Sequence, residues 1–81
     1  MDNPRPRAAA NLLYRFTLSD ADGQVYVTDH LCLDVTDAGR EAAACAEVMG
    51  LTLQGAHRLR AAAPLPAGAK WLRSHPDYRR G

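Results

Sequence analysis

The sequence predicts an α+β fold in which a β-hairpin packs on one main helix and one or two short helices follow. The prediction comes from two segments of alternating apolar residues, an Asp-Gly turn between them, and a narrow apolar stripe at helical spacing after them. The strands are expected at about residues 12–19 and 24–35, and the helix at about residues 37–49. At 81 residues the chain has room for one domain only.

The hairpin follows from alternation on both sides of the turn. The apolar side of the first strand is formed by alternate residues, which are Leu12, Tyr14, Phe16 and Leu18. Asp20 at the start of the turn and Gly23 at its left-handed position suit a short loop. The apolar side of the second strand is expected to hold Val25, Val27, Leu31, Leu33 and Val35. Asp29 would fall on that side, and because an unpaired buried carboxylate is costly, a bulge or strand break is expected there.

The main helix is marked at both ends. Thr36 or Asp37 can cap its N-terminus, and Gly50 suits its C-terminus. Its apolar stripe recurs at helical spacing and consists of Ala38, Ala42, Cys45, Ala46 and Met49. The small side chains would let this helix lie close to the hairpin.

The segment after the helix fits two patterns. Residues 51–63 alternate as a strand would, with Gly55 as a flaw, and they also show apolar spacing typical of a helix. The intrinsic preferences of Ala, Leu, Arg and Gln favour the helix. Pro64 ends this element, and a further short helix over residues 67–74 would pack Trp71 back onto the domain.

Composition divides the chain into a flexible basic arm at residues 1–10, a domain at residues 11–75 and a basic tail at residues 76–81. The net charge is only +1, but acidic residues fill the middle and basic residues the last third, which suits a docking surface. Two cysteines do not form a disulfide framework, and no apolar run is long enough for a signal peptide or a membrane span. We therefore expect a cytoplasmic protein with reduced thiols and no membrane partner.

Residues able to bind metal or perform catalysis are scattered. His30 and Cys32 form one short-spaced pair, whereas a zinc site normally needs four ligands. The same two residues could pair as nucleophile and base, but a third orienting group is not evident. Asp20 with Asp22, and Asp34 with Asp37, already have roles in a turn and a helix cap. The sequence predicts no catalytic residue, no metal, no cofactor and no enzymatic activity.

The outer face of the predicted hairpin is a candidate recognition surface. Its residues are expected to be Leu13, Arg15, Thr17, Tyr26, Thr28, His30 and Cys32. These residue types are typical of interfaces, and the free strand edges could accept another strand. The alternative is that the segment around Trp71 covers this face.

Residues 40–62 resemble the helix-turn-helix family. The positions that carry the resemblance are Ala46, Met49, Gly50, Leu51, Ala56 and Leu59. The resemblance implies a recognition helix in the DNA major groove, with His57, Arg58 and Arg60 facing phosphates or base edges.

A second resemblance covers residues 12–49. It rests on Phe16-x-Leu18-x-Asp20-x-Asp22-Gly23, then Asp29, Leu33 and Asp34, followed by alanines at helical spacing. This pattern is similar to a family of small bacterial proteins of unknown function that open with a strand, an Asp-Gly turn, a second strand and an Ala/Glu-rich helix. The resemblance implies the hairpin-helix fold and carries no activity.

Two functional hypotheses follow. The first is a small non-enzymatic interaction protein that docks on a protein or a protein–nucleic acid complex. Stand-alone adaptors are of this kind, and so are phage or mobile-element inhibitors of host systems such as anti-CRISPR proteins. The alternative is a helix-turn-helix transcriptional regulator that binds duplex DNA. A core with few large side chains also favours a homodimer, formed through the sheet edge or the outer face. The candidate partner-binding residues are Arg15, Tyr26, His30, His57, Arg58, Arg60 and Arg73.

Overall fold

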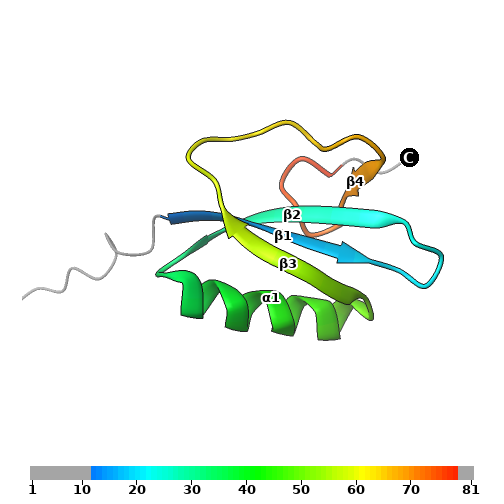
Figure 1. Ribbon diagram of the computed structural model, residues 1–81, viewed down its shortest axis with the longest axis horizontal. Coiled ribbons are helices and arrows are strands. Elements are labelled where there is room, and N and C mark those ends of the chain that lie inside the picture. The colour runs from blue at the N-terminus through cyan, green and yellow to red at the C-terminus, as the bar shows by residue number, and fades with distance from the viewer. Residues whose placement is uncertain (1–11, 79–81) are drawn as a thin grey trace, which may run out of the picture.

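The computed structural model describes residues 12–78 and confirms the α+β fold, with the hairpin packed on one helix (Figure 1). Its elements in chain order are β1 (Leu12–Ser19), β2 (Val25–Cys32), α1 (Val35–Met49), β3 (Thr52–Arg58) and β4 (Ala69–Trp71). The strands form one sheet in the order β3-β1-β2-β4. β1 is antiparallel to β2 and β3, whereas β4 is parallel to β2.

The turn between β1 and β2 forms as the sequence predicts. The Asp20 carboxylate accepts hydrogen bonds from the backbone N–H groups of Asp22 and Gln24, both at 2.9 Å. Gly23 has a φ of 86°, in the left-handed region that glycine adopts without strain. The loop aligns Ser19 with Val25, and this alignment sets the register of the whole hairpin.

Helix α1 begins earlier than predicted. Its N-cap is Asp34, not Thr36 or Asp37, and the Asp34 carboxylate accepts the N–H of Asp37 at 2.8 Å. Asp37 in turn accepts the N–H of Leu33 at 2.8 Å, so the two carboxylates stabilise the helix start reciprocally. The predicted C-cap is confirmed, since Gly50 has a φ of 70°.

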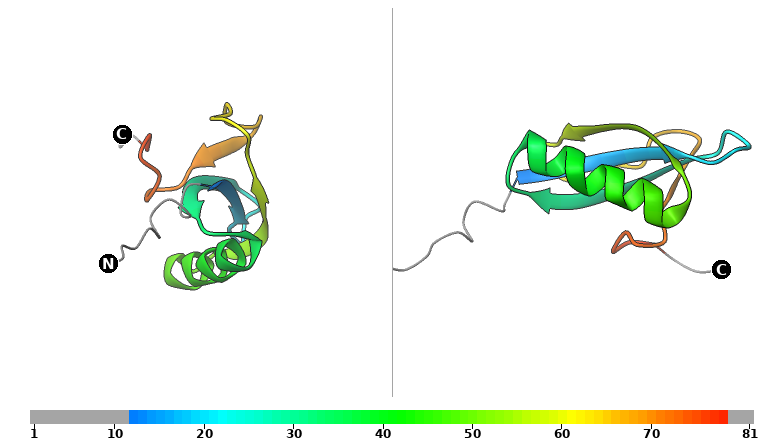
Figure 2. Two further views of the ribbon diagram at one scale, coloured as in Figure 1. Left: turned by 90° about the vertical axis from the view of Figure 1, so that its left-hand side faces the viewer. Right: turned by 90° about the horizontal axis from the view of Figure 1, so that it is seen from below.

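The helix covers one face of the sheet, and the loop between β3 and β4 arches over the other (Figures 1 and 2). On the helix face, the buried alanines of α1 face large residues of β1. The buried members of this core are Tyr14, Phe16, Leu18, Cys32, Ala38, Ala42, Ala46 and Leu72. The alanines allow close approach, so the aromatic and aliphatic residues of β1 provide most of the buried apolar area.

The prediction of which side of strand β2 faces the helix is wrong, because the polar residues of β2, and not its aliphatic residues, share the helix face. Phe16 lies directly across from Thr28, and Tyr14 from His30, so Thr28 and His30 share the helix face with these core residues. The aliphatic residues of β2 therefore lie on the far face with Arg15. There Val27 is fully buried by the segments that cross the sheet, whereas Leu31 remains 61% exposed.

The strand break expected at Asp29 is also wrong. β2 is continuous, and Asp29 lies directly across from Arg15, whose charge balances its own. The irregularity in the sheet lies between β1 and β3 instead. There the register shifts between Thr17 and Leu18, which pair with Gly55 and Leu53.

Of the two patterns that residues 51–63 fit, the structure forms the strand, as β3 over residues 52–58, and the favoured helix is wrong. The further short helix expected over residues 67–74 is also wrong, because residues 69–71 form strand β4. The second helix of the helix-turn-helix pattern is therefore not formed. Pairing along β1 outweighs the intrinsic helix preference of this segment, because β-strand formation depends strongly on tertiary context.

Some predictions fall outside the described part of the chain. The arm at residues 1–10 lies there, and so do residues 79–81 of the basic tail. Within residues 12–78, no helix is long and apolar enough to cross a membrane.

Candidate functional site

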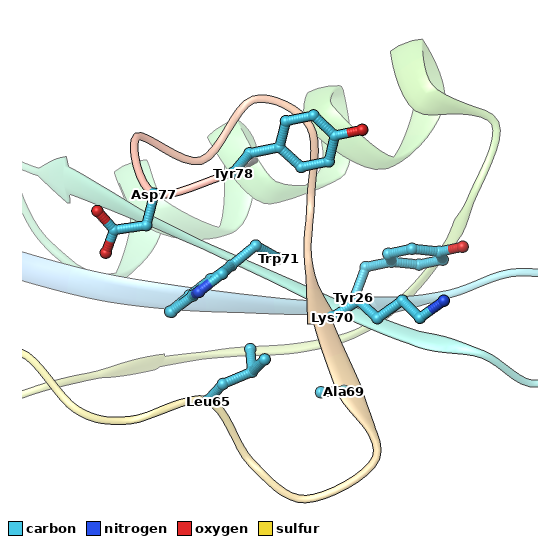
Figure 3. A pocket seen from close by; sticks show the side chains of 7 residues that line it. All are labelled: Tyr26, Leu65, Ala69, Lys70, Trp71, Asp77 and Tyr78. Atoms are coloured by element: carbon cyan, nitrogen blue, oxygen red, sulfur yellow. The ribbon is translucent and has the colours of Figure 1, made fainter. Parts of the chain in front are cut away.

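An open depression of about 800 Å³ lies beside β2 and β4 (Figure 3). We call it the aromatic depression. It is lined by Tyr26, Leu65, Ala69, Lys70, Trp71, Asp77 and Tyr78. Two tyrosines and the tryptophan face this space, and a lysine and an aspartate provide charges of both signs. An open aromatic surface with mixed charge is suited to binding a macromolecule rather than enclosing a small substrate.

The sheet brings these residues together from distant parts of the sequence. Tyr26 of β2 lies directly across from Lys70 of β4, and Val27 lies across from Trp71. Gln24 stabilises this junction, because its side-chain amide donates to the carbonyl oxygen of Gly68 at 2.9 Å. A short parallel strand therefore holds the chain's C-terminal third against the hairpin.

A second, smaller depression of about 270 Å³ adjoins the first. It shares Tyr26, Trp71 and Tyr78 with the aromatic depression. The remaining lining residues come from the hairpin loop, the end of α1 and the residues that follow it, and the segment after β4: Asp20, Met49, Leu51, Leu72 and Arg73. These three aromatic side chains therefore lie between the two hollows and line both of them, which extends the surface available to a partner.

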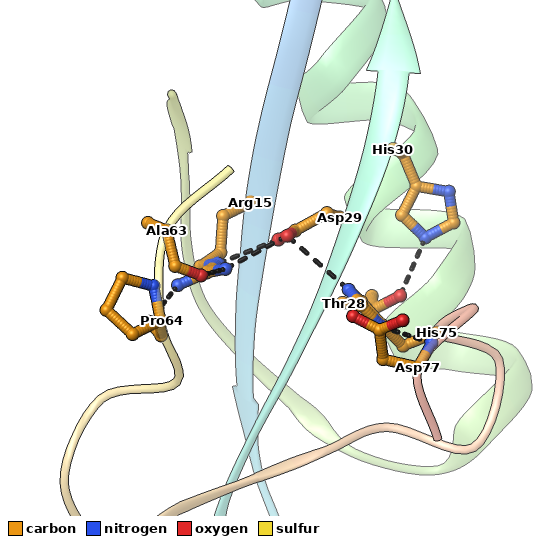
Figure 4. Close-up of polar contacts among 8 residues, drawn as sticks. All are labelled: Arg15, Thr28, Asp29, His30, Ala63, Pro64, His75 and Asp77. Atoms are coloured by element: carbon orange, nitrogen blue, oxygen red, sulfur yellow. Dashed lines mark hydrogen bonds and ion pairs between the residues drawn. The ribbon is translucent and has the colours of Figure 1, made fainter. Parts of the chain in front are cut away.

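A buried ion pair supports the aromatic depression from the far face of the sheet (Figure 4). The Arg15 guanidinium donates from Nε to Asp29 Oδ1 at 2.7 Å and from Nη2 to Asp29 Oδ2 at 2.9 Å. It also donates to the carbonyl oxygens of Ala63 at 2.8 Å and Pro64 at 2.9 Å. Arg15 is only 3% exposed, so this side chain joins the hairpin to the β3–β4 loop.

The ion pair shifts the titration of both partners. Burial raises the pKa of the Asp29 carboxyl, but the hydrogen bonds from Arg15 and His75 outweigh burial and hold this pKa below its ordinary value. The hydrogen bond to Asp29 raises the pKa of Arg15 above its already high value, against the opposing effect of burial. Both groups therefore remain charged at neutral pH.

His75 connects the ion pair to the aromatic depression. Its Nδ1 accepts the backbone N–H of Asp77 at 2.9 Å, and its Nε2 lies 3.4 Å from Asp29 Oδ2. Because a backbone N–H can only donate, Nδ1 carries no proton in this arrangement and the neutral ring holds its proton on Nε2. The ring stacks on Trp71, with 3.7 Å between centroids and 20° between planes.

Trp71 is held in place by these contacts. Besides the stacked His75 ring, the Arg15 guanidinium lies 5.3 Å from the centroid of the indole. The aromatic depression therefore has one wall whose position is determined by the buried polar residues behind it.

The structure divides the predicted partner-binding residues among three places. Tyr26 lines both depressions, and Arg73 lines the smaller one. His57, Arg58 and Arg60 are exposed at the end of β3 and just beyond it, away from this site. Of the remaining two, Arg15 is buried, whereas His30 is half-buried and lines a small hollow beside α1.

His30 faces the helix side of the sheet. Its ring stacks on Phe16, with 4.7 Å between centroids, and lies 3.2 Å from the Thr28 hydroxyl. Burial lowers the pKa of His30, which favours the neutral ring. This histidine contributes to packing beneath β2 rather than to the outer surface.

Several residues of the aromatic depression were missed by sequence reasoning. Lys70, Asp77, Tyr78 and Leu65 were not predicted as site residues, and Trp71 was expected only as structural cover. One available signal was the position of Trp71 and Tyr78, two of five aromatic residues, in a Pro-containing segment too short to form a core of its own.

The described residues offer no clear metal or thiol chemistry. Among residues 12–78, no three His, Cys, Asp or Glu side chains come close enough together to hold a metal ion. Burial raises the pKa of both cysteine thiols, Cys32 and Cys45, which disfavours the reactive thiolate.

Comparisons with protein-family models, with curated proteins and with solved structures found no match to this chain.

Proposed function

We propose that this protein is a small non-enzymatic interaction protein that docks on a partner protein through the aromatic depression. The observation that carries the proposal is the distribution of the five aromatic residues of the chain. Tyr14 and Phe16 are buried in the core, whereas Tyr26, Trp71 and Tyr78 gather at one open surface. Tyrosine and tryptophan are enriched among the residues that dominate binding energy in protein interfaces.

The site is organised before a partner binds. Trp71 is fixed by the His75 ring and by the Arg15 guanidinium, and the β2–β4 pairing fixes Tyr26 across from Lys70, the residue before Trp71. Because few side chains need to be ordered on binding, little of the interaction energy is lost to entropy.

The partner that best fits this surface is an extended protein segment. The depression runs along β4, which is an edge strand. The Leu72 N–H points toward β2, where it donates to the Val27 carbonyl oxygen at 2.8 Å. Successive residues of a strand alternate in direction, so the backbone groups of Trp71 point outward. An extended segment could pair with these groups while its side chains contact the aromatic rings.

The charges at the rim would select among such segments. Lys70 and Asp77 both line the depression, so a partner segment with an acidic and a basic residue would complement it. Through such docking the protein could inhibit a host system, as anti-CRISPR proteins do. DNA binding has no equivalent support, because the segment that would form the recognition helix is strand β3.

The predicted homodimer is a separate proposal. β3, which has seven residues, is the other edge strand of the sheet, and its outward backbone groups could pair with a second copy. Light scattering of the purified protein over a range of concentrations would test it: a constant monomer mass would contradict the dimer.

Site-specific photo-crosslinking in the source cell tests the docking proposal. A photoreactive phenylalanine analogue would replace Tyr78, which is 38% exposed at the aromatic depression. The matched control would carry the same analogue in place of Arg40, an exposed residue of α1 outside both depressions. We expect a discrete protein adduct from position 78 and not from position 40. Equal adducts from both positions, or none from position 78, would overturn the proposal.

A further inference from the structure

His75 joins two parts of the molecule that otherwise make separate contacts. On one side, its Nε2 faces the Asp29 carboxylate of the buried ion pair. On the other side, its Nδ1 accepts the N–H of Asp77, and Asp77 and Tyr78 form one wall of the aromatic depression. A single buried ring thus connects the charge state of the interior to the shape of the proposed docking surface (Figure 4).

We propose that the protonation state of His75 controls the Asp77–Tyr78 wall of the aromatic depression, so that docking is strongest when the ring is neutral. This inference deepens the proposed function and rests on it for the link to binding. Its structural part, a change in the wall on protonation, concerns the isolated protein.

The chemistry of imidazole gives the direction of the effect. The neutral ring has one acceptor nitrogen, and Asp77 uses it. When a proton from solvent binds Nδ1, both ring nitrogens become donors and the lone pair that accepted the Asp77 N–H is lost. Two N–H groups then face each other, and the contact between the ring and Asp77 becomes repulsive.

The surroundings of His75 determine which side moves. The Asp29 carboxylate from β2 attracts a charged ring, and the Trp71 face from β4 also favours a cation. Arg15 from β1 opposes the charge, but it is itself paired with Asp29. The ring is therefore held in place, and the Asp77–Tyr78 backbone is the part free to shift.

Other titratable groups near His75 do not reverse this direction. His30 of β2 is close enough to interact with His75 electrostatically, and burial favours its neutral form. Glu41 of α1 lines a small hollow with His30 and with Ser74, the residue before His75. The Tyr78 N–H also donates to the His75 carbonyl oxygen at 2.9 Å, so protonation loosens this turn without unfolding it.

Hydrogen exchange measured by NMR tests the inference on the isolated full-length chain. The protection factor of the Asp77 amide would be compared at pH 8 and pH 5, a range over which imidazole ordinarily changes its charge. Loss of one hydrogen bond should lower the protection about tenfold at pH 5. The His75→Asn variant places an amide oxygen near the position of Nδ1 and does not titrate, so its protection should be equal at both pH values.

Two results would overturn the inference. One is an Asp77 protection factor in the wild-type protein that does not change between pH 8 and pH 5. The other is an equal decrease in His75→Asn, which would assign the pH effect to another group. Because this measurement involves no partner, its failure leaves the crosslinking result at position 78 intact, and failure of crosslinking leaves this result intact.

Discussion

Replacement of Asp29 by asparagine removes the counter-charge of a guanidinium that is almost fully buried. Arg15 is 3% exposed and Asp29 14%, so solvent screens neither charge well. Removing one partner of a buried ion pair costs about 3–5 kcal/mol. Asparagine keeps one acceptor oxygen, and the carbonyl oxygens of Ala63 and Pro64 still accept from Arg15, so we expect the lower end, about 3 kcal/mol.

Urea unfolding at pH 7 measures this loss. Trp71 is the only tryptophan, and its fluorescence reports on the surroundings of the ion pair, while circular dichroism reports on the whole fold. With a urea dependence of about 1 kcal/mol per M, the midpoint should fall by about 3 M. The matched control is Asp22→Asn, an exposed carboxylate in the hairpin loop, which should change stability by less than about 0.5 kcal/mol.

A difference below about 1 kcal/mol between Asp29→Asn and Asp22→Asn would refute the structural role of the pair. Because the single variant could fail to fold, the double variant Arg15→Met with Asp29→Leu provides a second measurement. Replacing both charges by apolar groups removes the uncompensated charge, so the double variant should be more stable than Asp29→Asn. A double variant less stable than the single one would also contradict the reasoning.

Three further predictions concern stability. The pKa of Asp29 is lower in the folded protein than in the unfolded chain, so its ionised form stabilises the fold above a pH of about 3.9. This stabilisation is lost as the pH falls further, so the free energy of unfolding should decrease less on acid titration in Asp29→Asn. Asp34→Ala should lower the free energy of unfolding by about 1 kcal/mol and Thr36→Ala by clearly less in urea titrations, and the reverse order would contradict the observed cap. Gly50→Ala should lower the thermal midpoint, since alanine at a φ of 70° costs about 1 kcal/mol, and an unchanged midpoint would argue against this cap.

The hairpin and the main helix could be predicted from local signals. The alternation from Leu12 to Leu18, the turn at Asp20 and Gly23, and the helix end at Gly50 each depend on residues close in sequence. The face of β2 could not be predicted in this way, because one residue of register reverses it and the register depends on the loop. The aliphatic residues of β2 do alternate as predicted, but they lie on the face of the sheet away from the helix, where Val27 is buried.

The site was harder to predict than the fold for a related reason. Arg15 and Asp29 are 14 residues apart and meet only through strand pairing. The sequence therefore predicted a bulge or strand break at Asp29, where the structure has one partner of an ion pair. β4 has three residues, too few for any periodic pattern to indicate a strand. Without β4, Trp71 and Tyr26 cannot be assigned to the same depression, so the sequence does not reveal the aromatic depression.

The central claim is that docking occurs at the aromatic depression and not at the basic end of β3. Once crosslinking has identified the partner, isothermal titration calorimetry with Tyr78→Ala and Arg58→Ala compares the two places directly. We predict that Tyr78→Ala weakens binding by about thirtyfold or more, as for a residue that dominates an interface, and that Arg58→Ala changes it less than about threefold. Unchanged affinity in Tyr78→Ala together with a large loss in Arg58→Ala would contradict the account.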